Sequence, residues 1–449
     1  MHTHSPPSSG SIPVRYRRIL ILTVMVVSAT ACHPDPPPEE PLTWEDRYVD
    51  AAPDLDASME DIASTVDSQP DLTTDTDLMD MASGPDLDQS SVEDEEMDQR
   101  EDLDMGGSGT GYLYVSGGNN GDRGFIARIA YDSARKRLTR EADIRAGNML
   151  TYLAYSPRHD LLYAPDEAKL ELHVFDVASE DGSLSMHATS PTGCHGVHVM
   201  LDPAQEHIVM ACYREGETEL FHHPDRDTIS STHRVESGAR THQACMTPRE
   251  DRLFVVSLQR QQLMRYHLDA GNHRLEALEP PAITIPGNIG PRHMVMHPTQ
   301  PLAYVLGELQ PSVHVARWDE ATGSLSTGRG VSLLENDATR QTTGAAIRLH
   351  PSGRWLLSTQ RFLDGRDGRL VVLALDESGE PQGEPRFFST LGEKPRDFHI
   401  SPDGNLVAVA NRNSRAVAIF GFDAQTGELT YLRSEQMPGE PLSVLFVER

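Results

Sequence analysis

The segment GPRHMVMHPTQPLAYVLGEL, residues 290–309, places Arg292 and His293 at the start of one apolar run and Glu308 at the end of the next. A histidine can donate or accept a proton near neutral pH. An arginine can bind a carboxylate or phosphate through two parallel hydrogen bonds, and a glutamate can act as a base or orient one. These side chains can act together only if the two runs bring them to one place.

The two runs belong to a repeat. Each repeat has a short apolar run, a polar turn containing proline and a second apolar run. The separations of the turn prolines are 46, 45, 50, 53 and 51 residues, and the prolines are Pro157, Pro203, Pro248, Pro298, Pro351 and Pro402. A period of this length indicates a propeller, a solenoid or an array.

The apolar runs are about five residues long and rich in β-branched and aromatic side chains, which favours strands. A second hairpin follows in each repeat, as in 312–328 and 416–432, so a repeat predicts four strands, the content of one propeller blade. A seventh repeat is split between the start of the domain and PLSVLFV at its end. We therefore predict an all-β fold, a seven-bladed propeller of residues 111–449. Its C-terminal strand pairs with the N-terminal blade, and a six-bladed ring is the alternative.

In an antiparallel hairpin the start of one strand lies beside the end of its partner. Side chains at these positions should therefore meet at one rim, opposite the proline turns. The positions before or after the runs are Glu167, His198, Tyr213, His242, Arg292, His293, Glu308, Arg361, Arg396, Asp397 and Asn411. The alternative for any one of them is a solvated or paired surface charge, such as an Arg396–Asp397 pair.

Two blocks carry a family resemblance over essentially all of 111–449. GPRHMVMHP with AYVLGEL, and KPRDFHISPDGNLVAVANRNS at 394–414, resemble motifs of the seven-bladed lactonase family. That family includes bacterial 6-phosphogluconolactonase and the fungal carboxymuconate lactonising enzyme. The resemblance implies a site formed by His242, Arg292, Glu308 and Arg361. Gly307 and Gln360 depart from the family pattern, where asparagine is usual, and leave the substrate open.

The resemblance implies a hydrolase that opens a small anionic sugar lactone in a central cleft, as 6-phosphogluconolactonase does. A lactone is an internal ester, so its opening needs an activated water and stabilisation of an oxyanion. We expect His242 to be the general base, with Glu308 as the alternative base or the group that orients His242. Arg292 and Arg361 would bind the anionic group and the oxyanion. We expect four further residues to bind substrate, namely His198, His293, Arg396 and Asn411.

The histidines are scattered over the repeats rather than set at metal-ligand spacing, so we predict no metal and no cofactor. The alternative function is a non-enzymatic cell-surface propeller that binds a protein, peptide or glycan, and a cycloisomerase is a third option. An enzyme should leave the four catalytic side chains convergent and partly exposed. A binding module should pair them in salt bridges and expose an apolar patch on the rim.

The N-terminus predicts export. The basic cluster RYRR precedes about 13 apolar residues, too few to span a bilayer, and SATAC then resembles a bacterial lipobox. We therefore predict a lipoprotein-type signal at 1–32, lipidation at Cys32 and a membrane-anchored protein in the periplasm or at the cell surface. A plain secretory signal or a one-helix anchor is the alternative.

Charge is concentrated in one segment. Residues 33–110 contain 25 acidic residues and two arginines, which predicts a disordered acidic linker because such a chain buries little apolar surface. The propeller itself is mildly acidic, which argues against a nucleic-acid partner. We expect a monomer. If Cys32 is lipidated, three cysteines remain and at least one is free. Cys194 and Cys212 could pair, but the sequence does not decide this.

Overall fold

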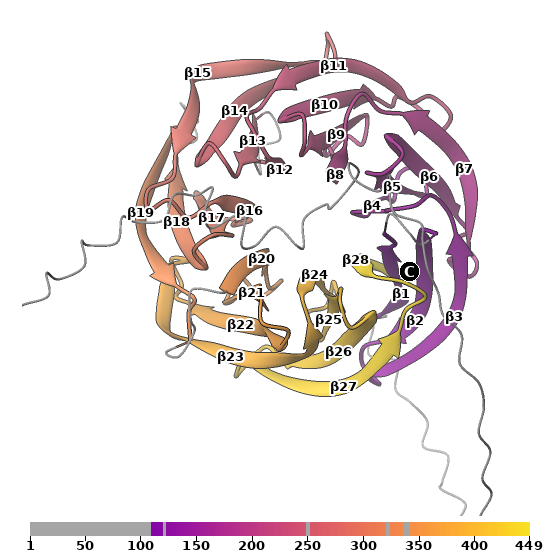
Figure 1. Ribbon diagram of the computed structural model, residues 1–449, viewed down its shortest axis with the longest axis vertical. Coiled ribbons are helices and arrows are strands. Elements are labelled where there is room, and N and C mark those ends of the chain that lie inside the picture. The colour runs from indigo at the N-terminus through magenta and orange to yellow at the C-terminus, as the bar shows by residue number, and fades with distance from the viewer. Residues whose placement is uncertain (1–108, 120–122, 248–251, 320–323, 336–341) are drawn as a thin grey trace, which may run out of the picture. The chain divides into compact units, whose positions relative to one another are not determined.

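A computed structural model of the protein describes residues 109–449, except 120–122, 248–251, 320–323 and 336–341. In this part of the chain, seven four-stranded antiparallel sheets surround a common axis (Figure 1). The described residues include no helix that is long and apolar enough to cross a membrane. The predicted signal peptide, Cys32 and the acidic linker lie outside the described residues.

The strands of the first four blades are β28 (Pro441–Glu448), β1 (Thr110–Gly117), β2 (Phe125–Asp132), β3 (Arg137–Arg145); β4 (Ala154–Ser156), β5 (Leu161–Asp166), β6 (Glu171–Val177), β7 (Leu184–Pro191); β8 (Gly196–Leu201), β9 (His207–Cys212), β10 (Glu217–His222), β11 (Ser230–Glu236); β12 (Thr241–Met246), β13 (Arg252–Ser257), β14 (Gln262–Asp269), β15 (Arg274–Thr284).

The strands of the other three blades are β16 (Pro291–Met296), β17 (Leu302–Gly307), β18 (Ser312–Trp318), β19 (Leu325–Ser332); β20 (Thr342–Leu349), β21 (Trp355–Phe362), β22 (Asp367–Leu375), β23 (Pro381–Glu393); β24 (Pro395–Ile400), β25 (Leu406–Asn411), β26 (Ala416–Asp423), β27 (Glu428–Gln436).

The C-terminal strand closes the ring. β28 pairs antiparallel with β1, from Glu448 opposite Gly111 to Ser443 opposite Ser116, and becomes the first strand of the N-terminal blade. The prediction of seven blades and of this closure is confirmed, and the six-bladed alternative is wrong. Pairing the two ends of the chain covers the edge that β1 would otherwise expose.

Burial explains why the apolar runs are continuous. Strands near the axis lie between neighbouring blades and are covered on both faces, so β5, β9, β17 and β25 are buried throughout. Outer strands alternate between exposed and partly buried residues, as in β27. The described core consists of seven clusters, each of which packs two adjacent blades together.

The proline turns lie at one end of these hairpins, as predicted. Pro157, Pro203, Pro298, Pro351 and Pro402 fall between the first and second strands of their blades, and Pro248 lies outside the described residues.

At the other end the first strands are irregular. The pairing register shifts at the start of β8, β12, β16, β20 and β24. In β16 the shift falls between Pro291 and His293, so Arg292 is the extra residue. A bulge re-aims side chains and lets two consecutive residues face the same side of a strand. This irregularity positions the candidate site.

Candidate functional site

Three charged side chains from two neighbouring blades meet at the bulged end of the ring. The Glu308 carboxylate, just after β17, lies between two guanidinium groups. Arg361 Nη2 of β21 is 2.7 Å from Glu308 Oε1, and Arg292 Nε of β16 is 3.2 Å from Glu308 Oε2. The second contact is an ion pair without hydrogen-bond geometry.

Backbone and hydroxyl groups of β20 fix both arginines. Arg361 Nε donates to Thr343 Oγ1 at 3.0 Å, and Arg361 Nη2 donates to the Gly344 carbonyl at 3.1 Å. Arg292 Nη1 donates to the Ala345 carbonyl at 2.6 Å. The trio Arg292–Glu308–Arg361 is therefore held by the first two strands of both blades, which keeps its geometry rigid.

Histidines continue the site toward the other blades. The ring of His293 lies 5.0 Å from the ring of His242 and 6.1 Å from that of His198. Arg292 Nη1 is 3.2 Å from His293 Nε2 and, as an obligate donor, assigns that nitrogen as the acceptor and the ring proton to Nδ1. Within the described residues, the buried Nδ1 atoms of His198, His242 and His293 make no hydrogen bond.

Burial and neighbouring cations keep these histidines neutral. Burial, followed by Arg348 and Arg292, lowers the pKa of His198 to about 3. Burial, followed by Arg292, holds the pKa values of His242 and His293 well below their usual range. Burial also lowers the pKa of Arg292 to about 9, although Glu308 opposes that shift.

The structure brings together the four residues expected to be catalytic, but it buries them. The exposed fractions are 4% for His242, 1% for Arg292, 3% for Glu308 and 7% for Arg361. Convergence is what we expected of an enzyme, whereas the expectation that these side chains are partly exposed is wrong. The mutual ion pairs match what we expected of a binding module.

The four residues expected to bind substrate are placed differently. His198 and His293 belong to the histidine row, and the charge of partly exposed Arg396 contributes to lowering the pKa values of His242 and Arg292. Asn411, the last residue of β25, is buried and donates its amide to the Thr390 carbonyl at 2.8 Å. That contact ties it to β23 of the preceding blade.

Sequence reasoning missed two residues of the inner ring. The Tyr152 ring packs against the His198 ring at a tilt of 40°, with centroids 4.2 Å apart, and Arg348 contacts both Tyr152 and Asp397. Tyr152 lies five residues before its repeat proline, as His198, His293 and Asp397 do, so this spacing could have found it. Arg348 lies three residues before Pro351, and this spacing does not find it. Asp397 pairs with Arg348.

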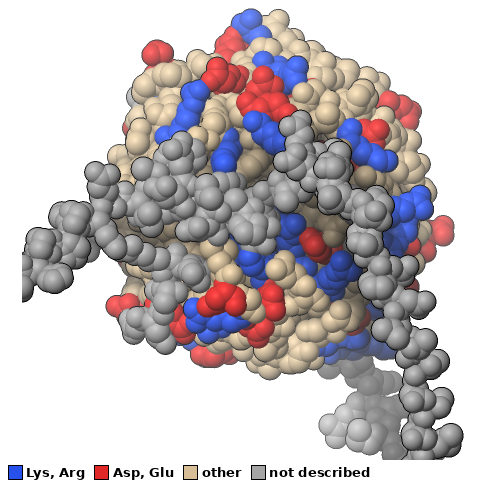
Figure 2. Space-filling model, in the orientation of Figure 1, with Lys and Arg blue, Asp and Glu red and all other residues tan. Residues whose placement is uncertain are grey.

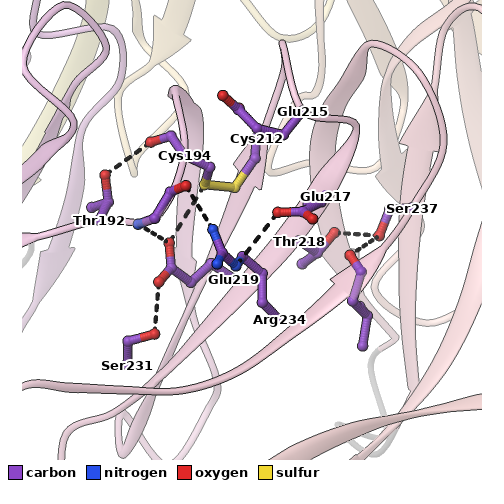
Figure 3. Close-up of polar contacts among 12 residues, drawn as sticks. Thr192, Cys194, Cys212, Glu215, Glu217, Thr218, Glu219, Ser231, Arg234 and Ser237 are labelled. Carbon is purple, nitrogen blue, oxygen red and sulfur yellow. Dashed lines mark hydrogen bonds and ion pairs between the residues drawn. A yellow bond between two sulfur atoms is a disulfide. The ribbon is translucent and has the colours of Figure 1, made fainter.

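Cys194 and Cys212 form a disulfide with their Cα atoms 5.5 Å apart, and Cys245 is the free cysteine of the described residues. Figure 3 shows Glu219 beside this disulfide. The Glu219 carboxylate accepts hydrogen bonds from the Gly193 amide at 3.0 Å and from Ser231 Oγ at 2.6 Å. The disulfide joins the segment before β8 to the end of β9. The next residue, Tyr213, packs its ring against that of His242, with centroids 5.6 Å apart.

Two groups in the described chain have metal-ligand residue types close together. Cys194, Cys212 and Glu219 form one group, but both sulfurs are committed to the disulfide. Asp166, Glu171 and His173 form the other. Asp166 accepts the amides of Asn148 at 2.7 Å and Met149 at 3.1 Å, so its carboxylate already holds a turn together.

Positive and negative side chains are interspersed over the face drawn in Figure 2. Among the described residues, many surface charges form ion pairs, such as Arg386 with Glu428 at 2.6 Å.

Comparison with known proteins agrees with the fold. A family described as "Lactonase, 7-bladed beta-propeller" matches residues 112–446. The 6-phosphogluconolactonase of Bacillus subtilis is 26% identical over 365 residues, which cover 76% of this chain and 98% of the relative. That of Enterobacter sp. (strain 638) is 25% identical over 277 residues, which cover 62% and 82%.

Solved structures show the same fold. The periplasmic gluconolactonase of Pseudomonas aeruginosa superimposes with a TM-score of 0.68 at 22% identity, covering 76% of this chain and 99% of its own. A protein from Lactobacillus plantarum gives 0.67 at 24% identity, covering 76% and 100%. With 335 residues matched by the family and seven blades in the structure, the chain belongs to the seven-bladed β-propeller lactonase family.

Proposed function

We propose that this protein is an exported hydrolase that opens a small anionic sugar lactone at the bulged end of the propeller axis. One observation carries the proposal. Three neighbouring histidines have buried Nδ1 atoms that make no hydrogen bond within the described chain, and one of them, His293, contacts Arg292 of the rigid Arg–Glu–Arg trio. Buried polar groups are ordinarily paired, so this arrangement suits a ligand that supplies the missing partners.

Lactone opening needs a base for the attacking water, a cation for the oxyanion and a group that binds the substrate. His242 accepts a proton from the attacking water as that water adds to the lactone carbonyl. Burial, followed by Arg292, lowers the pKa of His242, which keeps the ring neutral but weakens it as a base, and a bound anionic substrate would oppose the effect of Arg292. Arg292 or Arg361 stabilises the oxyanion. When the ring C–O bond breaks, the proton passes from His242 to the leaving ring oxygen, which gives the open hydroxy acid.

An anionic sugar lactone fits the charge of the site. Arg292, Arg361 and Arg396 lie close enough that each arginine affects the pKa of His242, and Glu308 is their acidic neighbour in the trio. These three cations outnumber the two carboxylates that act on Arg292, those of Glu308 and Asp397, which favours a negatively charged ligand. The names of the relatives, 6-phosphogluconolactonase and gluconolactonase, support an aldonolactone or its phosphate as the substrate class.

Three features support export. They are the lipobox-like SATAC ending at Cys32, the Cys194–Cys212 disulfide, and a relative named as periplasmic. Disulfides persist in oxidising compartments. We therefore place the propeller outside the cytoplasm, as a monomer on a lipid anchor at Cys32, and expect its lactone to be one found there.

The test is hydrolysis of a lactone panel that includes glucono-δ-lactone and 6-phosphogluconolactone by the wild type and His242→Gln. We expect His242→Gln to lower kcat by about 10²- to 10⁴-fold, the usual contribution of a general base. Val197→Ala is the matched control, because Val197 is the second residue of β8 as His242 is of β12. Its kcat should stay within about threefold of the wild type.

The mutual pairing of Arg292, Glu308 and Arg361 favours one second candidate, a propeller that binds an anionic ligand without turning it over. Wild-type turnover no greater than that of His242→Gln on every lactone would favour this candidate over the hydrolase.

A further inference from the structure

A hydrogen-bonded chain of four side chains crosses the propeller axis beside the histidine row. Arg348 Nη2 of β20 donates to Tyr152 Oη at 3.1 Å and to Asp397 Oδ1 at 3.0 Å. Ser443 Oγ of β28 donates to Asp397 Oδ2 at 2.9 Å. We call Tyr152, Arg348, Asp397 and Ser443 the axial bridge. Its members come from four blades, and the blades of Tyr152 and Arg348 stand three positions apart in the ring of seven (Figure 1).

The axial bridge lies deeper than the charged trio. Arg348 is paired with Leu357, four residues before Arg361 along β21, and that spacing corresponds to about 13 Å. From this level the Arg348 side chain reaches back to Tyr152 and to Asp397, which is opposite Ala410 near the end of β25. Tyr152 and Asp397 lie at the level of His198 and His293, and Arg348 lies two residues further along its strand. The bridge therefore crosses the axis at the level of the histidine row and just beyond it.

Burial changes at this level. The residues in the bridge layer of the other blades are buried, namely His198, Gln243, His293 and Ala346. The residues two positions further along the first strands are all partly exposed, namely Ala154, Met200, Cys245, Val295, Arg348, His399 and Leu445. Solvent therefore reaches the inner strands beyond the bridge and touches Tyr152 and Arg348, but it is excluded from Asp397, Ser443 and the buried residues of the site.

Among the residues at this position of the seven first strands, only Arg348 can reach across the axis to Tyr152. At the equivalent position the other six blades carry Ala, Met, Cys, Val, His or Leu, which lack a long side chain with several donors. The cost of holding a guanidinium here is offset by Asp397, which also accepts the Val444 amide at 3.3 Å.

We infer that the axial bridge is the closed end of the substrate site, and that it restricts the protein to compact ligands that enter from the side of Glu308. This inference rests on the proposed function for its substrate class. The bridge acts as a specificity determinant: Tyr152 and Arg348 form a floor that a single sugar unit fits above and an extended acid does not.

The experiment compares binding of two probe acids, gluconate and lactobionate, by titration calorimetry. The second is gluconate with a galactosyl unit on O4. We expect the wild type to bind gluconate at least about tenfold more tightly, and Arg348→Met to reduce this preference to about twofold, since a methionine neither crosses the axis nor pairs with Asp397. Val295→Ala is the matched control. Val295 stands at the position equivalent to Arg348 in its own blade, so this variant enlarges the layer of Arg348 without changing a bridge residue. It should keep the wild-type preference for gluconate.

A second measurement needs no ligand. The ring of His198 lies on Tyr152, so water admitted by a broken bridge should raise the pKa of His198 toward its usual value. The pH titration of the His198 ring, followed by NMR, is expected to shift upward in Tyr152→Phe. This variant keeps the charges of Arg348 and Arg292 and the neighbouring His293, so a change in the pKa of His198 can come only from the loss of the Tyr152 hydroxyl.

The outcomes separate the two proposals. If neither acid binds any variant, the proposed function fails, and the His198 titration alone decides on the bridge. A wild-type preference that persists in Arg348→Met, equal wild-type affinity for both acids, or a His198 titration unchanged in Tyr152→Phe would overturn the bridge as the closed end of the site.

Discussion

Two arcs of the inner ring have the same backbone and different chemistry. At the bulge or its equivalent, the arc from β12 to β27 carries His242, Arg292 and Arg396, whereas the arc from β28 to β11 carries Leu442, Thr151 and Val197. The hairpins, bulges and interblade clusters are repeated in both arcs. The fold therefore does not depend on the charges. The candidate site of the charged arc therefore arises from its side chains and not from a different backbone.

The two arcs also differ in the kind of interaction that stabilises them. The charged arc contains the buried trio of Arg292, Glu308 and Arg361, in which two cations share one acid. The neutral arc contains the disulfide between Cys194 and Cys212, which needs no charge. If this contrast is correct, removing a charge should cost most in one arc, and removing the covalent bond should cost most in the other.

The largest expected effect is that of Glu308→Gln. It leaves Arg292 and Arg361 buried without a counter-ion, and breaking a buried ion pair from one side costs about 3–5 kcal/mol of unfolding free energy. Urea unfolding measures it. Glu428→Gln is the control, because Glu428 is 57% exposed and pairs with Arg386 on the surface, where the loss should be below about 1 kcal/mol. Equal losses of unfolding free energy in Glu308→Gln and Glu428→Gln would contradict the view that the buried trio stabilises the charged arc.

The second effect is that of Cys194→Ser with Cys212→Ser. The bond closes a loop of sequence separation 18, so its loss should lower the unfolding free energy by about 3 kcal/mol. Chemical denaturation of oxidised wild type and double variant measures this. Cys245→Ser changes a free cysteine and should cost less. A double variant as stable as the wild type would show that the neutral arc does not rely on the bond.

Much of this contrast could be predicted from the sequence. The proline spacing and the split repeat determined seven blades, and hairpin geometry placed His242, Arg292, Glu308 and Arg361 at one rim. Their burial could not be predicted, because it depends on how closely neighbouring blades pack. The axial bridge was missed for a related reason. Tyr152 and Arg348 are 196 residues apart, and only the closed ring brings them together.

The third effect links the two arcs, since His198 belongs to the neutral arc and Arg292 lowers its pKa. The folded-state pKa of His198, about 3, lies below its unfolded value near 6.5, so the unfolded chain takes up the proton first as the pH falls. Stability is therefore unaffected above about pH 7 and decreases below pH 6.5, by about 2–3 kcal/mol at pH 4.5 from this residue alone. Unfolding free energies between pH 7 and 4.5 should decrease less in His198→Gln. A slope that does not change in this variant would exclude His198 as the cause.

The smallest expected effect concerns Arg396, the partly exposed cation at the edge of the charged arc. Arg396→Gln removes long-range attraction for an anionic ligand but leaves the buried trio paired. We therefore expect KM for 6-phosphogluconolactone to rise about tenfold, equivalent to about 1.4 kcal/mol, with kcat nearly unchanged. For uncharged glucono-δ-lactone the rise should be about twofold or less. Steady-state kinetics at low and high salt tests this, because added salt should diminish the wild-type advantage on the charged substrate. Equal changes on both substrates would mean that Arg396 supports the site structurally, and the charge selectivity of this arc would then rest on Arg292 and Arg361.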